Sequence, residues 1–399
     1  MSVWAKVPMG PPDPILGLTA AFNEDQNPKK ALFGVGAYRD GNNKPHVLQC
    51  VRSAEQAIVE AKMNKEYLGI VGFPEFVQLA VKLMLGPDAL KAGNVAAVQT
   101  LSGTGGCRLA GDFYARFLGK GTPFYLPNPS WANHKNIFTD AGLTVKQYRY
   151  WEPRTCGLDL DGMLADIAAM EDGSAILLHA CAHNPTGVDP TIEQWGQISD
   201  ALAKRNVRIL FDAAYQGFAS GDPERDAAAA RLFLARGHQF ALVQSFAKNF
   251  GLYGERVGAL SMVCADADEA KRVDSQLKIL IRPLYSNPPV HGARIVAKIL
   301  SDPALTAQWR EECKAMANRI IAMRTALRSA LEATGSPKPW NHVTEQIGMF
   351  CYSGLTAEQV DALRTKYSIY ITKDGRISMA GVTSANVEYL AQGIHEVTK

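Results

Sequence analysis

FALVQSFAKNFGLYGERVGAL, residues 240–260, joins an apolar run of strand type to a glycine-punctuated loop that contains Arg256. Lys248 follows the apolar run directly. An ammonium group beside a buried strand is costly unless it is neutralised, paired or made covalent. A Schiff base with a carbonyl cofactor removes that cost and creates a reactive group. Ser245 and Arg256 are donors suited to a phosphate on that cofactor. Taken alone, the stretch fits a solvated loop lysine equally well.

Short apolar runs alternate with helical patterns through the middle of the chain. The clearest runs are residues 95–100, 123–126, 175–179, 208–211 and 241–244. Between two of them, Thr191 and the Glu193/Gln194 pair predict a capped helix over 191–206. This alternation is typical of an α/β fold with a largely parallel, doubly wound sheet. Ligands gather at the carboxyl ends of the strands in such sheets.

The length and the change of pattern along the chain predict more than one domain. At 399 residues, the chain exceeds the size at which one hydrophobic core usually stops growing. After residue 285 the pattern changes to long amphipathic helices, the clearest over 303–334, and then to an α+β pattern. The proline-broken start, 1–14, predicts an arm that packs on a second subunit or a free terminal tail.

Composition excludes several classes of protein. Apolar residues make up 47% and charged residues 20%, with a formal net charge of +3, which is typical of a soluble globular enzyme. No Lys/Arg run indicates binding to nucleic acid or a membrane surface. Seven cysteines without close pairs argue against a disulfide framework or a zinc site, and favour a reducing compartment. We therefore expect a cytosolic protein, or one whose presequence has been removed, because the start shows neither signal-peptide nor transit-peptide features.

The segment Ser102-Gly-Thr-Gly-Gly106 follows one of the apolar runs. We expect a helix to begin after it, near Arg108. Glycines let the backbone approach an anion closely, and the start of a helix offers free amides with a favourable dipole. The segment therefore predicts an anion site, although a plain glycine-rich turn explains it as well.

Polar side chains follow two other strand runs. Asp212 and Tyr215 come after residues 208–211, and Asn184 lies in the turn after residues 175–179. A desolvated carboxylate is suited to holding a cation or a protonated heterocycle, and a pyridine nitrogen kept protonated in this way makes the ring an electron sink. A helix-capping role for Asp212 is locally as probable. His179 and His183 bracket the strand end, so we interpret them as structural.

Two aromatic groups and two arginines complete the candidates. Trp131 is suited to stacking on a flat ring, and His134 to supporting Asp212 from behind. Arg282 and Arg376 are suited to gripping the two carboxylates of one substrate, each bidentately. Taken singly, core packing and surface exposure explain these residue types equally well.

Taken together, these segments closely resemble the aspartate aminotransferases of pyridoxal phosphate (PLP) fold type I, most of all the mitochondrial form. The similar segments follow one another along nearly the whole chain: GPPDPILG, KEYLGIVGFPEF, SGTG, HACAHNPTGVDP, AYQGFASGD, AKNFGLYGERVGA, LKILIRPLYSNPP and TKDGRIS. The resemblance implies a large domain with a mostly parallel seven-stranded sheet flanked by helices, and a smaller α+β domain. It divides the chain into an arm at 1–14, a small domain at 15–45 and 316–399, and a large PLP-binding domain at 46–315.

The resemblance also assigns roles to the residues around the cofactor ring. Lys248 binds pyridoxal 5′-phosphate covalently and moves the proton between the substrate Cα and the cofactor C4′. Asp212 pairs with the pyridine nitrogen, with His134 behind it. Tyr215 and Asn184 donate hydrogen bonds to the phenolic oxygen. All of these roles are implied by the family alone.

Further roles follow from the same resemblance. Trp131 stacks on the ring, and the α-carboxylate of the substrate meets Arg376, Asn184 and the backbone at Gly36. Arg282 reaches the distal carboxylate from the neighbouring subunit, so a homodimer with shared sites is implied. The phosphate is held by Ser102, Gly103, Thr104, Ser245 and Arg256, with Tyr67 of the neighbouring subunit.

The implied activity is reversible ping-pong transfer of an amino group, from L-aspartate and 2-oxoglutarate to oxaloacetate and L-glutamate. Relatives with the same motifs leave an aromatic amino acid or kynurenine aminotransferase as the alternative, and a non-catalytic protein on this fold as a second one. The partners implied are dicarboxylic amino acids and 2-oxo acids, with no metal. The mitochondrial matrix is the implied location, with the cytoplasm as the alternative. One departure from the family is Gly106-Cys107, where Ala-Leu is usual, which places an uncommon thiol near the expected phosphate site.

Overall fold

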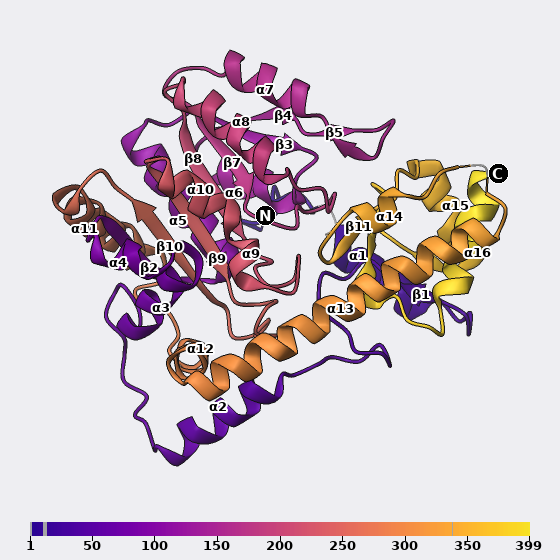
Figure 1. Cartoon of the computed structure of the whole chain (residues 1–399), viewed down its shortest axis with the longest axis horizontal. Helices are drawn as coiled ribbons and strands as arrows, with labels where there is room; N and C mark the ends of the chain where they lie inside the picture. The colour runs from indigo at the N-terminus through magenta and orange to yellow at the C-terminus, as the bar shows by residue number, and fades with distance from the viewer. Residues whose placement is uncertain (1, 11–13, 337) are drawn as a thin grey trace.

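The computed structural model describes residues 2–10, 14–336 and 338–399. Its centre is a seven-stranded sheet with the order β2-β10-β9-β8-β7-β3-β4 (Figure 1). These strands are β2 (Val95–Leu101), β3 (Pro123–Asn128), β4 (Thr144–Arg149), β7 (Ala175–His179), β8 (Arg208–Ala213), β9 (Phe240–Ser245) and β10 (Val257–Val263). Only β10 runs antiparallel to its neighbours. The mostly parallel seven-stranded sheet that the sequence predicted is confirmed.

Two strands were not predicted. β4 lies at an edge of the sheet and is largely polar, so it lacks the apolar run of a buried strand. β10 is buried throughout, but Gly258 near its start favours a loop in a local interpretation. The structure shows why glycine lies there: a Cβ on Gly258 would come within 2.5 Å of the backbone of Ser102. The close approach of the two backbones brings the SGTG segment against β9 and β10.

Helices cover both faces of the sheet, as Figure 1 shows. The helices between the start of the chain and the last sheet strand are α1 (Pro14–Glu24), α2 (Gln49–Glu60), α3 (Pro74–Leu85), α4 (Pro87–Lys91), α5 (Ser102–Phe117), α6 (Ala132–Asp140), α7 (Leu160–Ala169), α8 (Ile192–Ala203), α9 (Pro223–Asp226) and α10 (Ala228–Ala235). α8 has the predicted capping box between Thr191 and Gln194, and it ends three residues before the predicted boundary.

The prediction that a helix begins near Arg108 is wrong. α5 begins at Ser102, so the glycines of the SGTG segment form its first turn. Glycine disfavours helix interiors, which is why the sequence pattern suggested a later start. In the first turn, however, four backbone N–H groups have no partner within the helix, and small residues leave them accessible.

The C-terminal part of the chain is built from helices and short strands. Its helices are α11 (Ala267–Leu284), α12 (His291–Ser301), α13 (Pro303–Ala333), α14 (His342–Glu345), α15 (Ala357–Tyr367) and α16 (Val387–Thr398), with the 3₁₀ turn η1 (Met379–Gly381). α13 confirms the long helix predicted over 303–334. It extends from α12 and α2 beside the sheet to the C-terminal elements (Figure 1).

Short strands join the beginning of the chain to its end. β1 (Ala31–Leu32) pairs in parallel with β12 (Ile369–Tyr370), and β11 (Phe350–Tyr352) pairs with β13 (Arg376–Ser378). A hairpin of β5 (Trp151–Glu152) and β6 (Gly157–Leu158) follows β4. The pairing of β1 with β12 agrees with a small domain that contains both ends of the chain. Its boundaries at 45 and 316 stay a prediction, and residue 316 lies within α13.

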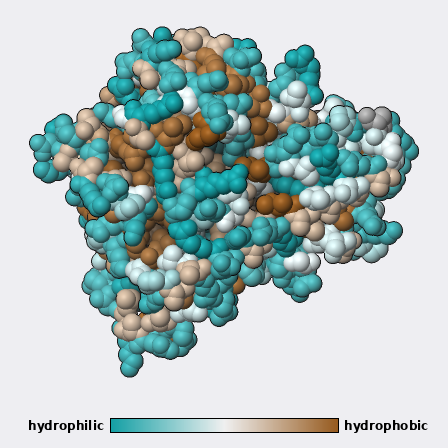
Figure 2. Space-filling view, in the orientation of Figure 1, coloured by the Kyte–Doolittle hydropathy of each residue, from teal (hydrophilic) through white to brown (hydrophobic). Residues whose placement is uncertain are grey.

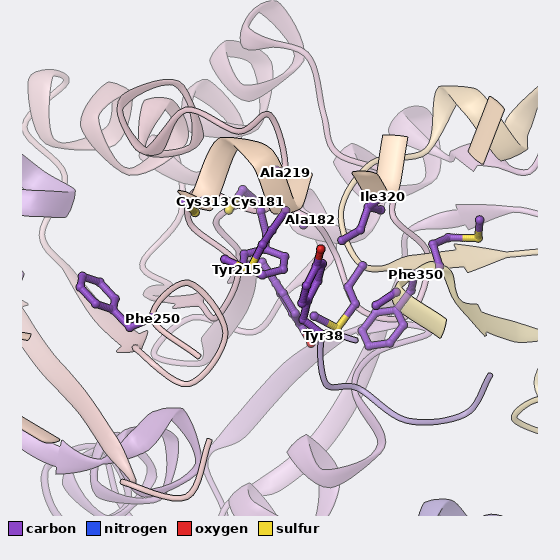
Figure 3. Packing of buried hydrophobic residues seen from close by; sticks show 14 of the residues in the cluster. Tyr38, Cys181, Ala182, Tyr215, Ala219, Phe250, Cys313, Ile320 and Phe350 are labelled. Atoms are coloured by element: carbon purple, nitrogen blue, oxygen red, sulfur yellow. The ribbon is translucent and has the colours of Figure 1, made fainter. Parts of the chain in front are cut away.

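One hydrophobic cluster connects the sheet-bearing part with the C-terminal part. Figure 3 shows Tyr38 and Tyr215 between Cys181 and Cys313 on one side and Ile320 and Phe350 on the other. The rings of Tyr215 and Phe350 meet edge to face, 5.9 Å between centroids. This packing fixes β11 and β13 close to the end of β8, where the predicted site residues lie.

The surface differs between the two parts. In Figure 2, hydrophobic residues gather on the sheet-bearing part, whereas the C-terminal part is mostly hydrophilic or intermediate. At the start of the chain, Trp4 and Val7 of the predicted arm are 75% and 66% exposed, and residues 11–13 of that arm lie outside the described residues. All seven cysteines are free and buried. Among the described helices, none combines the length and the apolar character that crossing a bilayer requires.

Candidate active site

A cavity opens where the carboxyl ends of the central strands meet the C-terminal part. It gathers residues from segments that are far apart in sequence, because β7, β8 and β9 end side by side: His179 pairs with Asp212 and Ala213 with Gln244. All but three of the predicted site residues line it. The lining residues are Gly36, Ser102, Gly103, Thr104, Trp131, His179, Asn184, Asp212, Ala214, Tyr215, Ser245, Ala247, Lys248, Tyr253, Arg256, Phe350 and Arg376.

Lys248 lies in the loop after β9, and its amine is enclosed by the cavity wall. Its Nζ lies 5.0 Å from the centroid of the Tyr215 ring. Burial lowers the pKa of the lysine, and the nearby Arg256 lowers it further, while Asp212 acts in the opposite direction. A lowered pKa increases the fraction of neutral amine, which is the form that attacks a carbonyl group and accepts a proton.

Asp212, near the end of β8, is held from behind by a histidine. Its Oδ2 accepts a hydrogen bond of 3.0 Å from Nε2 of the fully buried His134, whose Nδ1 lies 2.9 Å from Oγ of Ser130. Burial alone would raise the pKa of Asp212, but the hydrogen bond from His134 and the charge of Lys248 help hold it below its ordinary value. The carboxylate is therefore ionised, and it sits at the floor of the cavity.

The other oxygen of Asp212, Oδ1, is buried without a hydrogen-bond partner. A buried, unpaired carboxylate oxygen is costly and calls for a donor. The protonated nitrogen of a pyridine ring supplies such a donor and a compensating charge. The site therefore fits a pyridoxal-type ring with its nitrogen at Asp212.

Hydroxyls and a helix start form one end of the cavity. Ser102 and Ser245 lie with their Oγ atoms 2.9 Å apart, and Gly103 and Thr104 follow in the first turn of α5. Arg256 adds a guanidinium whose Nη1 donates to the carbonyl of Tyr253 at 2.9 Å. Free amides, hydroxyls and a cation that converge in this way fit a phosphate group.

A second arginine, Arg376, also lines the cavity. Arg376 on β13 is buried, with its guanidinium carbon 4.1 Å from the centroid of the Phe350 ring. It donates to Asn184 Oδ1 at 3.2 Å and to the carbonyl of Gly34 at 2.9 Å, and its Nε is buried without a partner. Burial lowers the pKa of this arginine. A carboxylate on a ligand would satisfy the free donor and balance the buried charge.

Two aromatic side chains, Trp131 and Tyr215, also line the cavity. Trp131 precedes α6 and meets His134 edge to face, with ring centroids 5.1 Å apart. Tyr215 interacts with Asn184 through a hydrogen bond, and burial raises the pKa of its phenol well above the ordinary value, although Arg376 opposes the increase. The phenol therefore stays protonated and able to donate.

Three predicted residues do not line the cavity. His134 stands behind Asp212, as expected. Tyr67 is 85% exposed, and Arg282 is exposed in the last turn of α11, where it donates to Ser286 Oγ at 2.6 Å. This single chain therefore does not bring Tyr67 and Arg282 to the site.

The cavity also contains residues that the sequence did not single out as ligands. Phe350 packs against the guanidinium of Arg376. Tyr253 also lines the cavity, and the sequence motifs gave it no role, although it lies in the segment GLYGER. His179 was interpreted as structural. It lines the cavity, and burial lowers its pKa to about 3, assisted by the neighbouring His134. Its position at the last residue of β7 was the available signal, because strand ends face the site.

Known proteins resemble this chain over nearly its whole length. Residues 28–394 match the family model described as aminotransferase class I and II. The chain is 58% identical over 398 residues to a mitochondrial aspartate aminotransferase of Dictyostelium discoideum, covering 99% of this chain and 93% of that protein. It is 56% identical over 400 residues to the mitochondrial aspartate aminotransferase of Gallus gallus, covering 100% of this chain and 95% of that protein.

A solved structure gives the same result. The aromatic-amino-acid aminotransferase from Burkholderia pseudomallei, covalently bound to pyridoxal phosphate, superposes with a TM-score of 0.97 at 44% identity, covering 100% of both chains. The matched region contains the sheet, the cavity and the C-terminal part. The chain belongs to the class I and II aminotransferases.

Proposed function

We propose that this cavity carries out transamination between L-aspartate and 2-oxoglutarate with pyridoxal 5′-phosphate as cofactor. The observation that carries the proposal is the convergence, in one cavity, of a lysine, an unpaired carboxylate oxygen, an anion site and a buried arginine. The relatives named aspartate aminotransferase, at 56–58% identity over the whole chain, support the substrate. The products are oxaloacetate and L-glutamate.

The cofactor would be held along the cavity floor. Lys248 would bind it covalently, Asp212 supported by His134 would hold its ring nitrogen, and Tyr215 with Asn184 would donate to its phenolic oxygen. Trp131 would stack on the ring. The phosphate would be held by the hydroxyl, amide and guanidinium donors of Ser102, Gly103, Thr104, Ser245 and Arg256. When bound, the cofactor supplies an electron-withdrawing ring that stabilises negative charge on the substrate Cα.

The protein's own residues orient the substrate and move its proton. Arg376, with Asn184 and the backbone at Gly36, would hold the α-carboxylate and so direct the Cα–H bond toward Lys248. The Lys248 amine, with its lowered pKa, accepts the proton from the Cα as a general base. A fixed orientation of this kind reduces the barrier by removing rotational freedom before the reaction.

The enzyme would function as a homodimer with shared sites. Tyr67 would reach the phosphate, and Arg282 the distal carboxylate, of the neighbouring subunit. Exposed apolar side chains accompany Arg282: Ile279 and Leu284, on or near the same turns of α11, are 50% and 42% exposed. Exposed apolar area next to functional side chains is typical of an interface.

A mixed dimer tests the sharing. Lys248→Ala and Arg282→Gln chains, each expected to have about a hundredth or less of the native kcat/KM for aspartate as a pure dimer, are combined by refolding or coexpression. In a mixed dimer one site receives both defects, and the other is native. Random pairing then restores about a quarter of the native activity. No recovery in the mixed preparation, with dimers present, would exclude shared sites.

A second candidate substrate class has support from one comparison. The structure from Burkholderia pseudomallei is named an aromatic-amino-acid aminotransferase, so aromatic amino acids or kynurenine remain the alternative. The test is the ratio of kcat/KM for aspartate to kcat/KM for phenylalanine and for kynurenine, each with 2-oxoglutarate. The proposal requires the ratio to favour aspartate by about 100-fold or more, since the aromatic substrates lack the distal carboxylate that Arg282 of the neighbouring subunit would bind. A preference for the aromatic substrates would replace it.

We propose that the protein functions in the mitochondrial matrix; the names of the relatives from Dictyostelium discoideum and Gallus gallus, both mitochondrial, support this location. Fractionation of the source cells, with the protein detected by an antibody, checks this. Enrichment with matrix markers is the expected result, and recovery with cytoplasmic markers would support the alternative.

A further inference from the structure

Three buried side chains behind the cavity floor lie close enough to share one ion. They are Cys107, His134 and Asp212, and their ligand atoms all lie within 4.8 Å of one another. Cys107 and His134 have no exposed surface, and Asp212 is 7% exposed. They come from α5, α6 and β8. No local spacing pattern joins them, since 78 residues separate His134 from Asp212.

The local packing explains how the thiol reaches this place. Gly106 precedes Cys107 on α5, and a Cβ there would come within 2.7 Å of Val243 on β9. The glycine therefore lets the helix lie close to the sheet, with Cys107 facing the end of β8. The electrostatic interaction of the thiol with Asp212 and Lys248 reflects the same closeness.

The ligand types and distances suit a thiophilic divalent ion. A tetrahedral zinc site with sulfur, nitrogen and oxygen ligands has ligand atoms about 3.3–3.6 Å apart, given its bond lengths. His134 Nε2 and Asp212 Oδ2 lie 3.0 Å apart. The two atoms would therefore have to move apart by a few tenths of an ångström to reach the spacing of a zinc site. The Cys107 sulfur lies within 4.8 Å of both other ligand atoms, so a further approach of about 1 Å would give the tetrahedral spacing.

Charge and the surrounding hydrogen bonds also agree. A thiolate and a carboxylate neutralise a divalent ion, so the buried site carries no net charge. Ser130 Oγ lies 2.9 Å from Nδ1 of His134. It can accept a hydrogen bond from that nitrogen when Nε2 binds a metal, which is the usual support for a ligating histidine.

We propose that, in the cofactor-free chain, Cys107, His134 and Asp212 bind one Zn²⁺ and that this ion competes with the cofactor. The competition rests on the proposed function, because Asp212 serves both the metal and the ring nitrogen. The metal binding does not rest on it. Asp212 Oδ1 is buried without a hydrogen-bond partner, so this carboxylate has binding capacity beyond its bond to His134, and a water molecule from the cavity would supply the fourth ligand.

The experiment uses the full chain stripped of cofactor. Zn²⁺ is titrated by calorimetry, and Co²⁺ is added separately to detect a thiolate-to-cobalt charge-transfer absorption. We expect one Zn²⁺ per chain and a charge-transfer band. Cys107→Leu, which installs the side chain usual in the family, and His134→Gln should weaken Zn²⁺ binding by about 100-fold or more, since each removes a direct ligand.

A buried cysteine elsewhere is the matched control. Cys264→Ser, one residue beyond the end of β10, should leave Zn²⁺ affinity and the cobalt band unchanged. If Cys107→Leu fails to fold, Cys107→Ser replaces it as a smaller change. Native Zn²⁺ affinity in the folded Cys107 variants, or equal loss in Cys264→Ser, would overturn the proposed site.

Competition is measured as the rate of pyridoxal phosphate uptake, followed by its absorbance on the protein. Zn²⁺ should slow uptake about tenfold or more in the native chain, chelator should restore it, and Cys107→Leu should be insensitive. Uptake unaffected by bound Zn²⁺ would overturn the competition. Failure of uptake in the metal-free native chain would instead contradict the proposed function, and the calorimetry would still report on the metal site.

Discussion

One chain alone forms the floor of the cavity, which includes Lys248, Asp212 and Ser245. The same chain leaves Tyr67 and Arg282, which we propose serve the site of a neighbouring subunit, exposed. On the floor, Asp212 and Ser245 are buried at strand ends and fixed by hydrogen bonds of 2.9–3.0 Å. Tyr67 is 85% exposed, and Arg282 is exposed with Ser286 as its hydrogen-bond partner. Groups that are already ordered lose little entropy when a ligand binds, whereas long exposed side chains must first be ordered.

The comparison assigns different roles to the two regions. The floor is preorganised for a cofactor within a single chain, and so it supports the chemistry. Under the proposed function, a second subunit would order the exposed side, and this side would select the substrate by its second carboxylate. Substitutions on the floor should therefore reduce the reaction with every substrate, and substitutions on the exposed side should depend on the substrate.

Removing the floor lysine has the largest expected effect. Lys248→Ala deletes the covalent anchor and the proton acceptor together, so kcat with aspartate should fall by at least about 10⁴-fold. Pyridoxal phosphate should still bind through Asp212 and the phosphate donors, which a binding titration measures. As the control, Lys271→Ala changes an exposed lysine on α11 and should leave kcat within about twofold. Turnover near the native value in Lys248→Ala would remove the basis of the mechanism.

Replacing the exposed arginine separates the two regions most clearly. Arg282→Gln should reduce kcat/KM for aspartate by about 100-fold, which is the effect of losing a charge-assisted bidentate pair. The kcat/KM for phenylalanine should stay within about threefold of the native value. Arg376→Lys should lower kcat/KM for both substrates, because every amino acid carries the α-carboxylate. Steady-state kinetics with both amino acids provide the measurement. Equal losses for the two substrates in Arg282→Gln would contradict the division of roles.

The sequence predicted the floor better than it predicted the exposed side's geometry. Lys248, Asp212, Asn184 and Ser102 follow strand runs, and strands of a parallel sheet end at one edge, so their meeting is a consequence of topology. For Arg376, the family resemblance was needed, because β13 lies outside the seven-stranded sheet. The sequence pattern of one chain does not show which of its residues would reach the site of a second subunit.

Other features could not be predicted because they depend on close packing. The strand character of β10 rests on Gly258 meeting the backbone of Ser102, a contact between segments about 150 residues apart, whereas local propensity favours a loop at glycine. The early start of α5 at Ser102 has the same cause. The cluster of Cys107, His134 and Asp212 likewise depends on the packing of α5, α6 and β8 against one another, which no local sequence pattern specifies.

Acid should test the floor through its buried histidine. Burial lowers the pKa of His179 from 6.5 to about 3, so between these values the unfolded chain binds a proton that the folded chain does not. Stability should therefore fall as the pH decreases below 6.5, by about 1.4 kcal/mol per pH unit for this group. Denaturant titrations at pH 6 and pH 5 should show a loss in the native protein that exceeds the loss in His179→Gln by about that amount. His291→Gln on α12 is the control, and equal slopes in native protein and His179→Gln would contradict a neutral buried imidazole.

The smallest expected effect belongs to the exposed tyrosine. Tyr67→Phe removes a single hydroxyl that we propose donates to the phosphate of the neighbouring subunit, and one hydrogen bond contributes about 0.5–1.5 kcal/mol. Affinity for pyridoxal phosphate should therefore fall by about twofold to tenfold, with kcat at saturating cofactor nearly unchanged. Tyr125→Phe serves as the control, because the Tyr125 hydroxyl lies on the surface near Glu171 and away from the cavity. The loss should appear only under conditions in which the protein is dimeric, since an 85% exposed side chain has no phosphate to meet within its own chain. An equal loss in the monomer would place Tyr67 in its own chain's site and remove the main support for a site divided between two subunits.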